Sequence, residues 1–152
     1  MTATFSERVI VDNSSGPNPT ITLVVGSDNR TATYMSHDNA TLVFRYTIQA
    51  TGTSGENDSN GISIPENALD NHSSTIRDVA LNYAILTHSV VGDNSSYKVD
   101  TVLPTVSSVA ITGEQDGIQN SFLNAGDNVS VTATFSETVN VSGNPTLTLV
   151  VG

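Results

Sequence analysis

Residues 55–64, GENDSNGISI, carry oxygen-bearing side chains at alternate positions. Glu56, Asp58 and Asn60 precede Gly61, and this spacing resembles the opening of a calcium-binding loop, where alternating side chains converge on one cation. Such loops also need a bidentate carboxylate at their end, and Glu66 falls one position short of that place. Two hypotheses therefore remain for this stretch: a calcium site, or a polar hairpin turn.

A second group of acidic residues comprises Asp100, Glu114, Asp116 and Asp127. A β-sandwich gathers its loops at its two ends, so the fold could bring these carboxylates together. Calcium takes about six to eight oxygen ligands, and a cluster of this kind could supply several of them. The alternative is an acidic rim that is solvated and binds nothing.

Asparagine-linked glycosylation is a further chemistry that the sequence allows. The Asn-X-Ser/Thr acceptor sequence occurs eight times. The acceptor asparagines are Asn13, Asn29, Asn39, Asn57, Asn71, Asn94, Asn128 and Asn140. All lie at predicted turns or strand ends, where a bulky sugar could be accommodated. The count predicts a glycoprotein, unless it only reflects a chain rich in Ser, Thr and Asn.

Residues for catalysis are scarce in this sequence. His37, His72 and His88 have no spacing typical of a metal site or an acid–base pair, and no phosphate loop, nucleophile elbow or HExxH motif occurs. We therefore predict that the protein is not an enzyme. The formal net charge of −10 argues against binding nucleic acid or anionic lipid. The apolar runs are only a few residues long, which argues against a membrane span.

The elements that must position these residues are short strands. Apolar and polar side chains alternate in residues 129–136 and in residues 41–49, where Leu42, Phe44, Tyr46 and Ile48 form the predicted inward set. Further strands are predicted at residues 1–11, 20–26, 31–36, 62–64, 83–91, 96–99 and 106–112, and a helical turn or two at 65–69 and 76–81. The pattern predicts an all-β protein, an antiparallel β-sandwich built without disulfides, because the chain has no Cys.

The chain ends on a copy of its own beginning. Residues 131–152, VTATFSETVNVSGNPTLTLVVG, closely match residues 1–26, MTATFSERVIVDNSSGPNPTITLVVG, which carry four extra residues at 12–15. The stretch TATFSE recurs from Thr2 to Thr132, an offset of 130 residues. A fixed period marks a modular array, and at this length each module is a whole domain.

Five stretches in repeat order carry a resemblance to a known family: VDTVLPTVSSVAIT, NAGDNVSVTATFSETVNVSGNPTLTL, TLVFRYTIQ, NGISIPENAL and IRDVALNYAILTHSVV. Over essentially its whole length the chain resembles the immunoglobulin-like repeats of very large bacterial and archaeal surface proteins. The resemblance implies an immunoglobulin-like sandwich, with residues 1–100 as one repeat lacking its first strand and residues 101–152 as the first three strands of the next. Members of this family often stiffen the junction between repeats with calcium. Where they have Gly in a DAAGN turn, this chain has Leu81.

The implied role is that of a non-catalytic extracellular module, which builds a stalk, fibre or surface layer from neighbouring copies. The second part presents large apolar side chains at Val129, Val131, Phe135, Leu147, Leu149 and Val151. Leaving them in water forgoes about 1.5–3 kcal/mol each, so they need cover from a tandem continuation of the chain or from an exchanged strand. The alternative role is an adhesin or a carbohydrate- or protein-binding module, although the chain has no Trp and few aromatic residues to present to a sugar.

Overall fold

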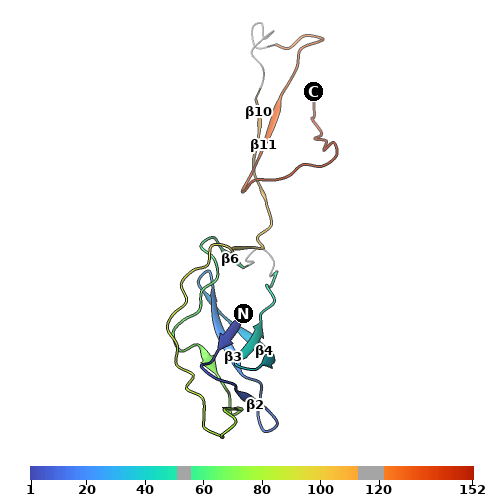
Figure 1. Cartoon of the computed structure of the whole chain (residues 1–152). Helices are drawn as coiled ribbons and strands as arrows, with labels where there is room; N and C mark the ends of the chain where they lie inside the picture. The colour runs from blue at the N-terminus through green and yellow to red at the C-terminus, as the bar shows by residue number, and fades with distance from the viewer. Residues whose placement is uncertain (51–55, 113–121) are drawn as a thin grey trace. The chain divides into compact units, whose positions relative to one another are not determined.

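The computed structural model describes residues 1–50, 56–112 and 122–152, and the chain divides into two compact units, Met1–Val102 and Leu103–Gly152 (Figure 1). A five-stranded antiparallel sheet is the main element of the first unit. Its strands are β1 (Thr2–Thr4), β3 (Thr20–Val25), β4 (Asp28–Asp38), β5 (Thr41–Arg45) and β7 (Leu69–Asp70), in the order β1-β5-β4-β3-β7. The pairing of β4 with β5 shifts register between Tyr34 and Ser36, which marks a bulge that bends the sheet.

Shorter strands form the rest of the first unit. Strand β2 (Ile10–Asp12) pairs with β8 (Thr75–Arg77), and β6 (Asn57–Asp58) pairs with β9 (Val99–Asp100), both antiparallel. Residues 62–64 and 83–91 join the structure through isolated bridges, such as those of Ile64 with Val91 and of Arg77 with Tyr83. These two segments are therefore extended but only sparsely paired.

The core lies between the five-stranded sheet and the shorter strands. Alternation directs Ile21 and Leu23 of β3 and Leu42 and Phe44 of β5 inward, and all four are buried. Ile76 of β8 packs into the same cluster from the opposite layer. The prediction of an all-β protein with antiparallel sheets is confirmed, and it holds because the apolar alternation gives each strand one buried face.

The structure differs from the predicted elements at several boundaries. Residues 1–11 form two strands, β1 and β2, and β5 ends at Arg45, so that Ile48 lies beyond the strand and is exposed. The predicted helical turns at 65–69 and 76–81 are wrong, since Leu69 belongs to β7 and Ile76 to β8. Pairing with β3 and β2 supplies the backbone of these short segments with partners that an isolated helical turn lacks.

The turn at residues 78–82 is tight even though Leu81 stands where Gly was expected. Leu81 takes a φ of 71°, in the left-handed region that Gly favours. The Asp78 carboxylate accepts hydrogen bonds from the backbone N–H and the side-chain amide of Asn82, both at 2.8 Å. The Leu81 N–H donates to the Asp78 carbonyl at 3.1 Å. These bonds hold Leu81 in a conformation that costs a bulky side chain energy.

The second unit contains an antiparallel pair, β10 (Val106–Ile111) and β11 (Val131–Phe135). Val106, Val109 and Ile111 lie opposite Phe135, Ala133 and Val131, so that the apolar residues of both strands share one face. Residues 136–152 contain no assigned strand, which differs from the predicted third strand. In the first unit the equivalent strand β3 pairs with β4 and β7, and the described residues of the second unit contain no counterpart of either.

Candidate functional site

Glu56 lies at the centre of a buried hydrogen-bonded cluster in the first unit. Its Oε1 accepts hydrogen bonds from Arg30 Nε, at 2.5 Å, and from the Tyr46 hydroxyl, while Oε2 accepts the backbone N–H of Gln49 at 2.8 Å. Burial raises the pKa of Glu56, but the bonds from Tyr46, Gln49 and Arg30 outweigh it and hold the pKa below its ordinary value. The Glu56 carboxylate is therefore charged, and donors of the same chain supply its hydrogen bonds.

Asp58 is surrounded by backbone donors. Its Oδ2 accepts the N–H of Gly26 at 2.9 Å, and its Oδ1 accepts those of Gly61 and Asn60 at 2.8 and 3.1 Å. The bond from Gly26 is the main cause that lowers the pKa of Asp58, and those from Gly61 and Asn60 add to it against the effect of burial. Gly61 has a φ of 103°, and a Cβ there would lie 1.9 Å from the Asn94 carbonyl oxygen. Only glycine lets the chain close on Asp58 at this point.

These contacts favour the polar-turn interpretation of residues 55–64 over the calcium interpretation. Glu56 and Asp58 face different sets of donors, and Asn60 contributes its backbone N–H to Asp58. A cation at this place would have to displace these N–H and O–H groups, because donors repel it. Within residues 1–50, 56–112 and 122–152, no group of three or more His, Cys, Asp or Glu side chains is placed to hold a metal ion.

The second predicted acidic cluster is described only in part. Asp100 lies in β9 and accepts the backbone N–H of Val102 at 3.1 Å. Asp127 belongs to the second unit and accepts the N–H of Asn124 at 2.6 Å. Glu114 and Asp116 lie outside the described residues. Calcium binding by these four residues therefore stays a prediction.

The eight glycan acceptor asparagines differ in exposure. Seven of them, Asn13, Asn29, Asn39, Asn57, Asn94, Asn128 and Asn140, are exposed. Asn71 is half-buried, and its Nδ2, the atom to which a glycan attaches, donates to the Ser74 carbonyl oxygen at 2.5 Å. Asn71 is thus the acceptor least suited to carry a sugar. Glycosylation of the others stays a prediction.

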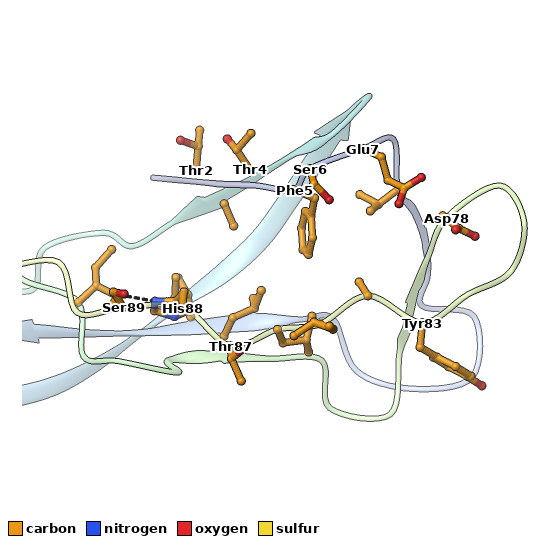
Figure 2. A pocket seen from close by; sticks show the side chains of 18 of the residues that line it. Thr2, Thr4, Phe5, Ser6, Glu7, Asp78, Tyr83, Thr87, His88 and Ser89 are labelled. Atoms are coloured by element: carbon orange, nitrogen blue, oxygen red, sulfur yellow. Dashed lines mark hydrogen bonds between the residues drawn. The ribbon is translucent and has the colours of Figure 1, made fainter.

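A cleft of about 530 Å³ opens between residues 2–7 and residues 82–91 of the first unit. Figure 2 shows Phe5 pointing into this space toward Thr87, whereas Thr2 and Thr4 point away from it. Apolar side chains such as Phe5, Ile21 and Leu86 line the inner wall. Strand β1, on one side of the cleft, pairs only with β5 among the described strands, so the cleft runs along an open sheet edge.

His88 is the cleft residue that most resembles a catalytic group, but its ring is engaged elsewhere. Its Nε2 accepts the backbone N–H of Ala68 at 2.9 Å, and its Nδ1 lies 2.8 Å from the Ser89 carbonyl oxygen. The His88 backbone N–H also donates to the Asn67 side-chain oxygen at 3.1 Å. These bonds tie residues 82–91 to residues 67–68, which is a structural role.

Sequence reasoning missed the partners of the two buried acids. Arg30, Tyr46 and Gly26 complete the clusters around Glu56 and Asp58, and none of them stood out in the sequence. One signal was present for Arg30, which is one of only five Lys and Arg residues beside fifteen Asp and Glu residues. In such a chain, a buried acid has few possible cationic partners.

Neither a protein-family model nor a curated protein nor a solved structure matches this chain. No helix in the described part of the chain is long and apolar enough to cross a membrane. The contacts and the strand register of the chain itself are therefore the basis for inferring its function.

Proposed function

We propose that this chain is a non-catalytic, extracellular structural repeat of the immunoglobulin-like kind. Neighbouring copies build a stalk, fibre or surface layer at the cell surface, as a tandem array or by exchanging strands. The observation that carries the proposal is the different pairing of one repeated strand. The stretch TATF at residues 2–5 contains β1 (Thr2–Thr4), its copy at residues 132–135 lies in β11 (Val131–Phe135), and the two copies pair along different edges.

Strand β1 pairs with β5, which follows it in the chain, whereas β11 pairs with β10, which precedes it. A complete repeat would join both partners to the same strand, because an interior strand of a sheet has two neighbours. Among the residues that the structure describes, each unit thus contains the pairing that the other is without. Modules of this kind complete one another when copies are arranged in series.

The uncovered apolar face of β10 and β11 supports assembly as well. Val106, Val109 and Ile111 are 55%, 55% and 73% exposed in the second unit. Contiguous exposed apolar residues on a strand pair mark a surface that is covered by further protein. A module that assembles with other copies uses such an apolar surface as an interface, whereas an isolated monomer has no use for it.

The alternative role, an adhesin or sugar-binding module, has less support. A sugar platform needs the free face of an aromatic ring. The guanidinium of Arg77 lies 4.2 Å from the centroid of the exposed Tyr83 ring and covers one face of it.

Two measurements test the proposed function. Light scattering with size-exclusion chromatography of the full chain at increasing concentration should show multiples of 15.9 kDa, and electron microscopy should show filaments or sheets. The intact mass of the native polypeptide distinguishes the two modes, since a tandem array contains many repeats. A native polypeptide of about 15.9 kDa that stays monomeric at all concentrations would contradict the proposal.

A further inference from the structure

The edge of β1 that faces away from β5 has backbone groups with no strand partner in the part of the chain that the structure describes. The Met1 nitrogen donates to the Phe44 carbonyl at 3.0 Å, and the Phe44 N–H donates to the Met1 carbonyl at 2.9 Å. Successive residues of an antiparallel strand direct their N–H and C=O groups to opposite edges. Thr2 and Thr4 therefore direct theirs away from β5, where β1 has no strand partner among the described residues.

Strand β11 uses the equivalent edge to pair with β10. The Thr112 N–H donates to the Ser130 carbonyl, and the Ser136 N–H donates to the Thr105 carbonyl, both at 2.8 Å. The even-numbered residues of β11 therefore face β10. Through the offset of 130 residues, the even-numbered residues of β11 correspond to those of β1. The same edge is paired in the second unit and open in the first.

We propose that the cleft beside β1 binds strand β10 of a second copy of this chain. The register follows from the second unit, where Ala110 lies opposite Thr132 and Ser108 opposite Thr134. Transferred by the repeat offset, Ala110 of the second copy lies opposite Thr2 and forms the centre of the new pair. The inference rests on the proposed function, because it requires that copies assemble, and it adds the strand, the acceptor cleft and the register.

The apolar face of β10 fits the cleft in this register. In the second unit, Val109 shares its face with Ala133, and Val106 shares its face with Phe135. The equivalent of Phe135 is Phe5, which packs against the core and lines the cleft. Val106, Val109 and Ile111 of the second copy would therefore point into the cleft, toward the apolar wall. The pairing would therefore bury these three apolar side chains.

The exchange is feasible because the pairing of β10 with β11 contributes little stability. An isolated pair of two strands is only marginally stable in water. In the first unit, by contrast, β10 would become the sixth strand of the five-stranded sheet, next to β1 and over a buried core. A second copy is the natural donor, because it carries the strand that already pairs with the TATF sequence.

A cysteine pair tests this register in the full chain, which has no Cys of its own. Thr2→Cys is combined with Ala110→Cys, since both residues are exposed and their replacement leaves the core intact. Residues directly opposite in an antiparallel pair lie about 4.5–5.5 Å apart, within reach of a disulfide. After mild oxidation, we expect a non-reducing gel to show dimers and higher multimers that reducing agent dissolves.

The matched control combines Ser6→Cys with Ala110→Cys. Ser6 is also exposed and even-numbered, but it lies beyond the end of β1 and four residues from Thr2, which is about 13 Å in an extended chain. We expect at least about tenfold less cross-linked multimer from this pair. A third variant, Ala110→Cys with Thr132→Cys, should close a disulfide within one chain and shows that the thiol at position 110 reacts.

Four results would overturn the inference. Equal cross-linking of the two test pairs would mean random collision, and a disulfide between positions 2 and 110 in a monomer would mean that the chain fills its own cleft. If neither pair cross-links while light scattering still shows multimers, copies assemble through another surface, and the proposed function stands without this strand pairing. If neither cross-links and no multimers form, strand exchange fails as a mode of assembly as well.

Discussion

Arg30 donates a hydrogen bond from Nε to the Glu56 carboxylate at 2.5 Å, and its Nη2 donates to the Asp28 carboxylate at 2.9 Å. The Glu56 side chain is 1% exposed, whereas that of Asp28 is 59% exposed. One guanidinium thus bridges a buried and a solvated acid. The two contacts differ far more in the burial of the acid than in distance. Comparing variants of the two acids therefore separates the effect of burial on stability from the effect of ion pairing.

Glu56→Gln should lower the free energy of unfolding by about 1–3 kcal/mol, because it leaves buried donors without a charged acceptor. Asp28→Asn should cost less than about 1 kcal/mol, since exposed ion pairs are screened by water. Urea denaturation of both variants beside the unmodified chain measures the difference. Equal losses would show that the Glu56 cluster contributes no more than a surface pair.

Acidification should destabilise the first unit through its depressed carboxyl pKa values. The bonds from Gly26, Gly61 and Asn60 lower the pKa of Asp58 against its burial, and the donors around Glu56 outweigh the burial that raises its pKa. A carboxyl with a depressed folded pKa stabilises above its unfolded pKa, and the contribution is lost as pH falls through the folded pKa. Stability should therefore hold from neutral pH to about pH 5 and decline below it.

Asp58→Asn tests which group causes this decline. The variant should be less stable than the unmodified chain at neutral pH, and the difference should shrink as the pH falls, because Asp58 in the unmodified chain becomes protonated. Denaturation midpoints measured between neutral pH and strong acid give this difference directly. A difference that stays constant over the whole range would assign the decline to other acids.

Leu81→Gly should stabilise the protein by about 0.5–1 kcal/mol, because it removes the strain of a left-handed φ from a bulky residue. The Leu81 side chain is exposed, so its loss removes little packing. Val79→Gly is the matched control in the same loop, since Val79 is also exposed and is not among the residues with positive φ. Val79→Gly should destabilise the protein by a similar amount, and thermal melts of both variants show whether each change raises or lowers the stability.

Site occupancy should be lowest at Asn71 when the chain is produced in a host that attaches N-linked glycans. The Asn71 amide donates into its own turn, whereas Asn39 is exposed at the turn between β4 and β5. Mass spectrometry of glycopeptides compares the two sites in one sample. Occupancy at Asn71 equal to that at Asn39 would show that the turn opens before glycans are attached.

Calcium bound by the second predicted acidic group, Asp100, Glu114, Asp116 and Asp127, should raise the melting temperature of the full chain in millimolar calcium relative to EDTA. Asp58→Asn should leave this increment unchanged, because the Asp58 carboxylate is taken by Gly26, Gly61 and Asn60. Asp100→Asn should reduce it. Identical melting temperatures in calcium and in EDTA would contradict the prediction that this protein binds calcium.

The sequence determined the positions and the inward faces of the strands. The alternation around Leu42 and Phe44 predicted buried positions, because the two-residue period of a strand is a local property. The repeat of TATFSE was likewise visible without a structure. Boundaries such as the end of β5 at Arg45 were not, since they depend on which neighbouring strand continues the pairing.

Tertiary structure decided what the acidic loop and the repeated strand do. The donors to Glu56 and Asp58 include Arg30 and Gly26, which lie 26 and 32 residues away in the chain, so no local spacing could separate a metal loop from a hydrogen-bonded turn. The sequence of TATF is the same in both copies, yet one pairs with β5 and the other with β10. Pairing is a contact between distant segments, and only the fold shows which edge is left open.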